Sequence, residues 1–212
     1  MSAPYAEVIG DPIAQTRSPA IHRHWLATLG LPGDYRATRM PPDELADYLA
    51  ARRGDPDWRG CSVTIPHKRS VLKLLDRIDP AASAIGAVNC ILPGLGGLTG
   101  RNTDVDGLAA ALASAPLDGR KAALIGAGGG ARAAIRYLLD AGAAEIAILA
   151  RNPAAHLGDA RVALYPFESC DEALEDAAAI VNATPLGMAG APPMPKPLLD
   201  CVGRHASGAT LL

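Results

Sequence analysis

The sequence predicts an α/β fold, because segments typical of strands alternate with segments typical of helices along most of the chain. Such alternation favours a mostly parallel sheet that helices cover on both faces. The composition agrees, since 49% of the 212 residues are hydrophobic and 20% are charged, as in ordinary globular proteins. A chain of this length can bury a real core and hold one or two domains.

Strands and helices are expected in regular order over the first part of the chain. Ser18 is a favourable N-cap and Pro19 suits the first helical turn, so a helix should begin there and stop at Gly30. Pro66 ends an apolar, strand-like run, and a helical pattern starts soon after it. The expected strands span residues 5–9, 34–38, 60–65, 86–92 and 98–100, and the expected helices span residues 19–29, 42–53, 71–75 and 80–85.

A second unit is expected to begin near residue 101, which divides the chain into domains of residues 1–101 and 102–212. Its central feature is a glycine-rich loop that directly follows a buried strand and directly precedes a helix, as in the first turn of a βαβ unit. The expected elements are a helix at 105–115, a strand at 121–125, a helix at 133–141, a strand at 145–150 and the start of a strand at 209–212.

The glycine-rich loop matches the dinucleotide-binding fingerprint as Gly126-x-Gly128-x-x-Ala131. Glycines permit the tight turn and let backbone N–H groups approach a pyrophosphate at the helix N-terminus. Alone, the pattern is weak, because a glycine-rich loop is often just a turn. Its place between a strand and a helix makes nucleotide binding the better interpretation.

The end of the next strand bears on the choice of cofactor. An NAD site usually has an acidic residue there, whereas this chain has Ala150-Arg151-Asn152. The guanidinium of Arg151 can hold a 2′-phosphate through charge-assisted hydrogen bonds, which favours NADP. The alternative is a solvated arginine at a strand end.

Lys68 and Asp104 are the ionisable groups best placed for proton chemistry, because each follows a strand-like segment. Open α/β sheets bind ligands at such strand ends. Carbonyl–alcohol interconversion by hydride transfer moves one proton to or from oxygen, which a lysine near a carboxylate can perform. By spacing alone, two unrelated surface charges remain the simpler interpretation.

Hydroxyl and amide side chains gather in the same stretches, as a polyhydroxylated acid would require. Helix capping by Ser18 and the β propensity of Thr64 are adequate alternative explanations. The residues concerned are Thr16, Ser18, Ser62, Thr64, Asn89 and Asn102.

Charge and hydropathy patterns exclude several classes of function. Twenty basic against 22 acidic side chains leave a net charge of −2, which points to neither nucleic acid nor an anionic membrane. The N-terminal residues lack a signal-peptide pattern, and no uncharged run reaches the roughly 18 residues needed to span a bilayer. We therefore expect a cytoplasmic protein, monomeric or homodimeric, whose partner is a small-molecule substrate.

The cysteines and histidines give no sign of a metal site or a disulfide. The cysteines are scattered without a Cys-x-x-Cys pair, which favours reduced thiols over a disulfide framework or a zinc site. The histidines have no metal-ligand spacing with acidic partners and are interpreted as structural or surface residues, so no metal is expected. These residues are Cys61, Cys90, Cys170, Cys201, His22, His24, His67, His156 and His205.

Six ordered motifs lie between residues 10 and 188. They are Gly10-Asp11-Pro12-Ile13-Ala14 with Ser18, Pro19 and His22; Val63-Thr64-Ile65-Pro66-His67-Lys68; Gly86-Ala87-Val88-Asn89; Asn102-Thr103-Asp104 with Gly107; Gly126-Ala127-Gly128-Gly129; and Asn182-Ala183-Thr184-Pro185-Leu186-Gly187-Met188. Together they are highly specific, and the sequence resembles the shikimate dehydrogenases.

The resemblance implies an N-terminal α/β shikimate-binding domain, a Rossmann-type doubly wound NADP-binding domain and a cleft between them. It implies NADPH-dependent reduction of 3-dehydroshikimate to shikimate, a step toward aromatic amino acids, with Lys68 and Asp104 as the catalytic pair. The implied substrate contacts are Thr16, Ser18, Ser62, Thr64, Lys68, Asn89 and Asp104. The implied cofactor contacts are Gly126, Ala127, Gly128, Gly129, Gly130, Ala131, Arg151, Asn152 and Thr184.

Three positions depart from the family pattern. Thr16 replaces the usual serine, and Ser62 stands where asparagine is frequent, which shortens one polar contact. After Arg151 a second basic residue is usual but absent, with His156 a potential substitute, so NADP preference is expected to be weaker.

The sequence stops at the beginning of a strand, where family members continue with a tyrosine-bearing loop and a glutamine-containing helix. We therefore expect these 212 residues alone to be weakly active or inactive, and full activity would refute this. Two alternatives stay open: a quinate/shikimate dehydrogenase that uses NAD, and a non-catalytic homologue that binds nucleotide or metabolite.

Overall fold

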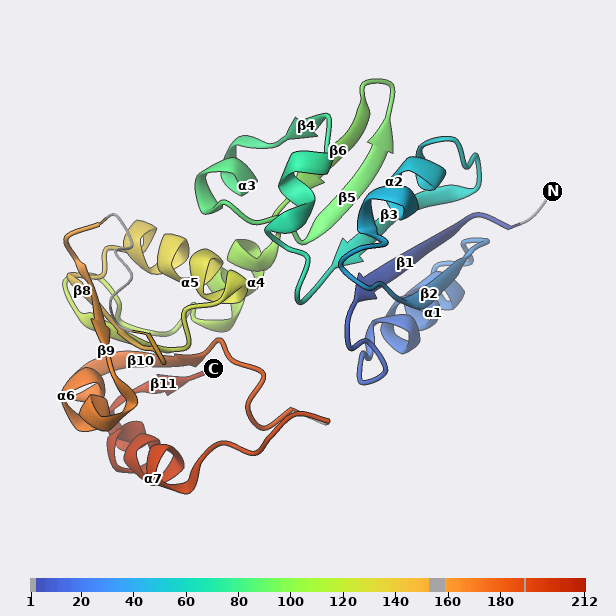
Figure 1. Ribbon diagram of the computed structural model, residues 1–212. Coiled ribbons are helices and arrows are strands. Elements are labelled where there is room, and N and C mark those ends of the chain that lie inside the picture. The colour runs from blue at the N-terminus through green and yellow to red at the C-terminus, as the bar shows by residue number, and fades with distance from the viewer. Residues whose placement is uncertain (1–2, 153–158, 189) are drawn as a thin grey trace. The chain divides into compact units, whose positions relative to one another are not determined.

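The computed structural model describes residues 3–152, 159–188 and 190–212, in two compact units, Met1–Thr103 and Asp104–Leu212 (Figure 1). Each unit contains a sheet with helices packed on it, which confirms the expected α/β class. Among the described residues, none of the helices has the length and apolar character that crossing a bilayer requires.

The first unit is built on a six-stranded sheet in the order β2-β1-β3-β5-β6-β4. Its strands are β1 (Tyr5–Gly10), β2 (Asp34–Arg39), β3 (Trp58–Val63), β4 (Arg77–Ile78), β5 (Cys90–Gly94) and β6 (Gly97–Arg101). Its helices are α1 (Ser18–Thr28), α2 (Leu45–Arg53), the 3-10 helix η1 (Ser70–Leu74) and α3 (Pro80–Ile85). β1 runs parallel to β2 and β3, whereas β5 is antiparallel to β3 and β6, so this sheet is mixed.

Alternate residues of β1 face opposite sides of this sheet, as strand geometry requires. Tyr5 and Ile9 belong to a core that includes Leu49 of α2. Val8 packs on the other face beside Tyr35, whose ring stacks on His22 of α1. The helices therefore cover both faces of the sheet. Because β1 and β3 are parallel neighbours, their carboxyl ends lie at the same rim of the unit.

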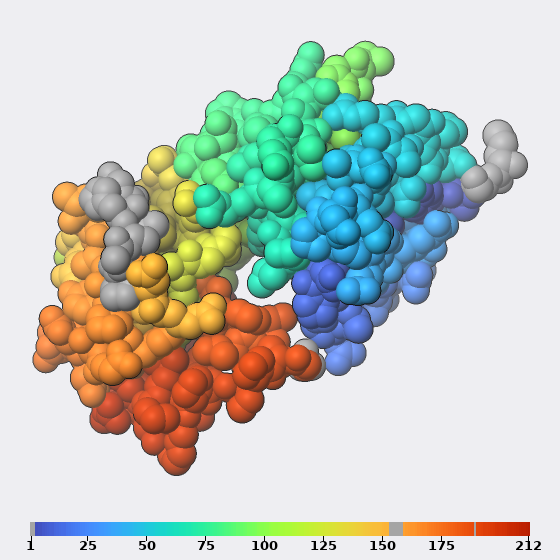
Figure 2. Space-filling model, viewed as in Figure 1, coloured from blue at the N-terminus to red at the C-terminus, as the bar shows by residue number. Residues whose placement is uncertain are grey.

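A glycine-rich hairpin joins β5 to β6. β5 and β6 pair along their length, with Gly94 opposite Gly97. The hairpin projects from the surface of the first unit, in light green at the top of Figure 2, and Leu95 at its turn is fully exposed.

The second unit has a five-stranded, fully parallel sheet in the order β11-β10-β7-β8-β9. Its strands are β7 (Lys121–Ile125), β8 (Glu145–Leu149), β9 (Val162–Tyr165), β10 (Ala177–Asn182) and β11 (Thr210–Leu211). Its helices are α4 (Asp104–Ala111), α5 (Gly129–Asp140), α6 (Cys170–Leu174) and α7 (Lys196–His205), with 3-10 turns η2 (Phe167–Ser169) and η3 (Ala206–Gly208).

This second sheet is doubly wound. Leu124 of β7 faces a core that includes Leu138 of α5, whereas Ile125 faces a core that includes Leu174 of α6 and Leu198 of α7. The strand order changes direction between β7 and β10, and ligands of such sheets bind at the carboxyl ends of the strands at this point.

Several expected boundaries were wrong. Residues 86–89 are not a strand, because Gly86 ends α3 in the left-handed region at φ 68° and β5 starts only at Cys90. The segment at 70–74 is a 3-10 helix, α2 starts three residues later than expected, and α5 starts four residues earlier. The two-residue strand β4 was not expected.

The expectation of four reduced thiols was also wrong. Cys170 of α6 and Cys201 of α7 form a disulfide, whereas Cys61 and Cys90 remain thiols. The pair is separated by 31 residues, and the packing of α6 beside α7 brings their Cα atoms to 6.4 Å. No local sequence pattern encodes this pairing.

Candidate active site

Gly10, the last residue of β1, lies directly against the end of β3. A Cβ at Gly10 would lie 2.5 Å from Thr64 Cγ2 and 2.8 Å from the Ile65 carbonyl oxygen. The Asp11 N–H also donates to the Ile65 carbonyl at 3.0 Å. The loop after β1 and the turn after β3 are therefore held side by side, at the carboxyl ends of two parallel strands.

Two half-buried hydroxyls, Thr16 and Ser18, lie next to each other in the loop after β1. Thr16 Oγ1 is 3.2 Å from Ser18 Oγ and accepts from the Ser18 N–H at 3.3 Å. The prediction that Ser18 caps the helix was wrong, because α1 begins at Ser18 itself and the capping position is Arg17. The Ser18 hydroxyl turns toward Thr16, so the two hydroxyls form one polar edge.

The turn after β3 fixes the backbone of Lys68. The His67 N–H donates to the Thr64 carbonyl at 2.9 Å, and the Lys68 carbonyl accepts from the Val88 N–H at 2.8 Å. The half-buried Lys68 side chain therefore starts from an anchored backbone.

His67 provides a second anchor beneath this turn, consistent with its interpretation as structural. Its side chain is fully buried, and Nε2 lies 2.6 Å from the Met40 carbonyl oxygen. Since a carbonyl only accepts, Nε2 carries the proton. Nδ1 is buried without a hydrogen-bond partner in the described part of the chain.

Asn89 links the start of β5 to the end of the first unit. Its side-chain amide donates to Thr103 Oγ1 at 3.1 Å, and its Oδ1 accepts from the Thr103 N–H at 3.0 Å. Asn102 is buried and donates to the Ala87 carbonyl at 3.0 Å. These contacts fix the backbone immediately before Asp104, the first residue of α4.

Ser62 points to the face of the sheet that α1 covers. Its hydroxyl accepts from Tyr35 Oη at 2.7 Å, and burial raises the pKa of Tyr35. Both residues line an apolar cavity of about 400 Å³ together with His22 and Leu26. The Ser62 hydroxyl is thus engaged by a neighbouring side chain of its own unit.

In the second unit, the glycine-rich loop follows β7 directly. Gly126 has φ +100°, and a Cβ there would overlap Thr184 Cγ2. At Gly128 and Gly130 an added Cβ would meet nothing within 4 Å, so internal packing leaves the space above both glycines open. Ala131 is fully buried in α5, which lets the helix approach the sheet.

This arrangement fits a dinucleotide pyrophosphate. The loop leads into the N-terminus of the 12-residue helix α5, whose first N–H groups favour an anion. The open space over Gly128 and Gly130 is where a phosphate would approach the backbone.

Thr184 belongs to a turn that follows β10, beside β7. Its N–H and Oγ1 both donate to Asn182 Oδ1, at 3.0 and 2.6 Å, and its Oγ1 accepts from the Leu186 N–H at 3.2 Å. Asn182 therefore positions Thr184. The motif containing Asn182 was visible in the sequence, but its role in this turn depends on the fold.

Arg151 and Asn152 are exposed directly after β8, the strand next to β7. Arg151 is thus available to a cofactor phosphate at this rim of the sheet. The suggested substitute His156 lies outside the described residues.

Comparisons with known proteins identify similar proteins for both units. Residues 8–91 match the model of the shikimate dehydrogenase substrate binding domain. The shikimate dehydrogenase (NADP(+)) of Sphingopyxis alaskensis is 46% identical over 199 residues, which cover 91% of this chain and 72% of that protein. The chain belongs to the shikimate dehydrogenase family.

Other family members support the same assignment. The shikimate dehydrogenase (NADP(+)) of Methylobacterium radiotolerans is 40% identical over 210 residues, covering 92% of this chain and 73% of that protein. Among solved structures, shikimate dehydrogenase 1 of Peptoclostridium difficile superposes with a TM-score of 0.85 at 25% identity, covering 98% of this chain and 85% of that chain.

A structure of the Thermus thermophilus family member contains NADP(H) and shikimate. It superposes with a TM-score of 0.79 at 33% identity and covers 99% of this chain and 86% of that chain.

Proposed function

We propose that the protein catalyses the reversible NADPH-dependent reduction of 3-dehydroshikimate to shikimate. The observation that carries this proposal is the 46% identity to a relative described as shikimate dehydrogenase (NADP(+)). The proposal assigns shikimate binding to residues 1–101 and NADP binding to residues 102–212.

The proposed substrate contacts are polar side chains of the loop after β1, of β3 and the turn after it, of the residue before β5 and of the first residue of α4. Gly10 and the Asp11–Ile65 hydrogen bond hold the loop after β1, which carries Thr16 and Ser18, against the segment after β3, which carries Thr64. The proposed set is Thr16, Ser18, Ser62, Thr64, Lys68, Asn89 and Asp104. Such hydroxyl, amide and ammonium groups suit a polyhydroxylated carboxylate.

Lys68 and Asp104 are proposed as the catalytic pair. NADPH, when bound, supplies the hydride to the substrate carbon. Lys68 donates a proton to the oxygen on that carbon and takes it back in the reverse reaction. Asp104 orients the lysine and the substrate hydroxyl. The contacts between Asn89 and Thr103 support this role, because they fix the backbone next to Asp104.

The proposed cofactor contacts are Gly126 to Ala131, Arg151, Asn152 and Thr184. The open space above Gly128 and Gly130 supports pyrophosphate binding there. Arg151 would hold the 2′-phosphate, and Thr184 would lie near the nicotinamide half. Because one arginine stands where two basic residues are usual, use of NAD is the alternative cofactor to test. Quinate is the alternative substrate to test.

The decisive experiment follows NADPH oxidation with 3-dehydroshikimate by absorbance, using the intact gene product. Lys68→Ala should lower kcat by roughly 10²–10⁴-fold with shikimate affinity largely retained. Lys73→Ala is the matched control, since Lys73 is exposed on η1 in the same stretch. Wild-type turnover by Lys68→Ala would remove the lysine from its role.

Rates with shikimate and quinate, each with NADP and NAD, separate the remaining candidates. A preference for quinate or NAD would replace the proposed specificity. Binding of NADPH and shikimate without turnover would indicate a non-catalytic homologue. The cytoplasmic location and the monomeric or homodimeric state stay predictions from the sequence, and light scattering tests the latter.

A further inference from the structure

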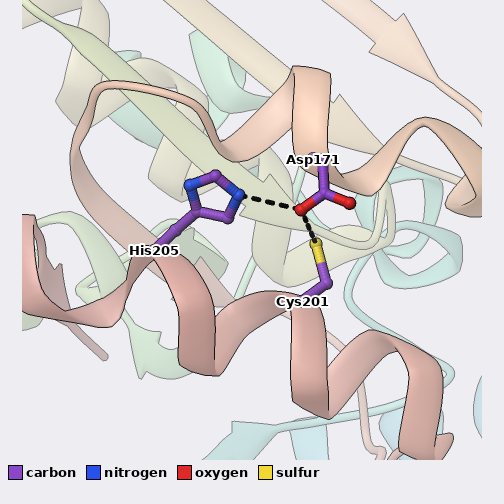
Figure 3. A group of neighbouring side chains, drawn as sticks. All are labelled: Asp171, Cys201 and His205. Carbon is purple, nitrogen blue, oxygen red and sulfur yellow. Dashed lines mark hydrogen bonds and ion pairs between the residues drawn. The ribbon is translucent and has the colours of Figure 1, made fainter.

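Four side chains that can bind metal meet where α6 packs beside α7, and none of them is assigned a role in the proposed function. Cys170 and Asp171 are adjacent at the start of α6. Cys201 and His205 are four residues apart on α7, so both lie on the same side of that helix. Figure 3 shows the imidazole of His205 and the sulfur of Cys201 directed toward the same carboxylate oxygen of Asp171.

The spacing of these atoms suits a metal ion. His205 Nε2 is 3.1 Å and Cys201 Sγ is 3.7 Å from Asp171 Oδ1, and one ligand atom from each residue lies within 4.8 Å of the others. A tetrahedral Zn²⁺ with bonds of roughly 2.0–2.3 Å keeps its ligand atoms about 3.3–3.8 Å apart. The three side chains need little movement to reach that geometry. Paired ligands at positions i and i+4 of one helix are a known way to bind zinc.

Burial gives the cluster a protected side and an open side. Cys170 and Cys201 are 5% and 1% exposed, whereas the Asp171 side chain is 65% exposed. An ion could therefore reach the site past Asp171 and bind sulfur in a dry environment. Sulfur and imidazole ligands select a borderline-soft ion such as Zn²⁺ over Mg²⁺ or Ca²⁺, which prefer oxygen.

Two features compete with metal binding in the present state. Both Asp171 oxygens accept from Arg204, which with His205 lowers the pKa of the Asp171 carboxyl. In addition, the Cys170–Cys201 disulfide leaves neither sulfur as a thiolate. Only a thiolate is a strong zinc ligand, so the site depends on reduction.

We propose that reduction of the Cys170–Cys201 disulfide creates a Zn²⁺ site formed by Cys201, His205 and Asp171, with the freed Cys170 as the fourth ligand. A dithiol or phosphine reductant supplies two electrons, and each sulfur takes up one proton. Zn²⁺ then replaces the thiol protons, which are released to solvent. Oxidation by a small-molecule disulfide such as oxidised glutathione reverses the change: the two sulfurs lose two electrons to the oxidant, the disulfide re-forms and the ion leaves.

The test measures metal binding, so it is independent of enzymatic activity. The full chain is reduced with a phosphine, desalted without oxygen and titrated with Zn²⁺ against a chromophoric chelator. One equivalent should bind to reduced protein, and none to protein oxidised with glutathione disulfide. Co²⁺ as a second probe should give the thiolate-to-metal charge-transfer band of a sulfur-bound ion.

Matched variants distinguish this site from adventitious binding. His205→Gln should weaken Zn²⁺ binding at least tenfold, whereas His24→Gln, at an exposed position of α1, should not. Cys201→Ser leaves Cys170 as the one thiolate of the site, so it should lower the intensity of the Co²⁺ band, whereas Cys90→Ser should leave the band unchanged. Arg204→Gln should strengthen binding, because it releases Asp171.

If Cys201→Ser fails to fold, the comparison of Zn²⁺ binding by His205→Gln and His24→Gln still tests the site. The proposal is overturned if reduced wild-type protein binds no Zn²⁺. It is equally overturned if oxidised protein binds as tightly, or if His205→Gln and His24→Gln behave alike.

Discussion

Gly126 and Thr184 are packed so closely that a Cβ on Gly126 would overlap Thr184 Cγ2. The contact joins the loop after β7 to the turn after β10, at the point where the strand order of the second sheet changes direction. The Ala183 N–H donates to the Ile125 carbonyl at 2.9 Å and holds the same two segments together. Two sequence motifs separated by more than fifty residues are therefore one structural feature.

Gly126→Ala should destabilise the second unit and weaken NADPH binding. The added methyl group meets Thr184, and φ +100° is a region that side chains rarely adopt, with a cost of about 1–3 kcal/mol. Thermal unfolding and NADPH titration measure the two effects. Gly128→Ala is the control, because its surroundings are open: it should keep the melting temperature and weaken NADPH binding. Equal melting of Gly126→Ala and wild type would contradict this account.

Arg151→Gln should weaken NADPH binding much more than NADH binding. Hydrogen bonds to a charged phosphate contribute roughly 1.5–3 kcal/mol, which corresponds to roughly 10–100-fold in the dissociation constant. Arg136→Gln removes the same charge from an exposed pair with Asp140 and serves as the control. If Arg151→Gln weakens both cofactors equally, Arg151 does not recognise the 2′-phosphate.

Local chemistry explains which parts of the fold could be predicted from the sequence. The loop at Gly126 was predictable, because a buried strand, a run of glycines and a helix follow one another without a break. The strand at Lys121–Ile125 was predictable for the same reason. By contrast, the strand expected at residues 86–92 was placed four residues too early at its start, since Gly86 in the left-handed region ends α3 and β5 begins only at Cys90.

The partners of individual side chains could not be predicted from the sequence. The hydroxyl of Ser18 looked like a helix cap, but its partner is Thr16. Cys170 and Cys201 looked unrelated, because only the packing of α6 on α7 brings them together. The polar residues of the candidate site could be named from motifs, whereas their supports, such as Thr103 for Asn89, emerged from the structure.

Asn89→Ala should impair turnover more than Thr103→Val. The first change removes the Asn89 amide and with it every side-chain hydrogen bond from Asn89 to Thr103, whereas the second leaves the Thr103 N–H to Asn89 Oδ1 bond in place. If Asn89 also contacts substrate, Asn89→Ala should raise KM as well as lower kcat, while Thr103→Val should chiefly lower kcat by loosening the backbone before Asp104. Steady-state kinetics separate these effects, with Thr99→Val of β6 as the control. Equal kinetics for all three variants would remove Asn89 from the site.

The stability of the first unit should fall as the pH drops through the range in which histidine titrates. His22 stacks on Tyr35 with ring centroids 3.9 Å apart, and burial lowers the pKa of His22 from its ordinary value of 6.5. The unfolded chain therefore takes up a proton at higher pH than the folded chain does. The contribution of neutral His22 is fully present above pH 6.5 and is lost as the pH falls toward the lower, folded-state pKa.

His22→Phe, which retains an aromatic ring against Tyr35, should flatten the dependence of the melting temperature on pH between about 7.5 and 5. His24→Phe changes an exposed position of the same helix and should leave the wild-type slope, so equal slopes for His22→Phe and wild type would show that His22 does not produce it.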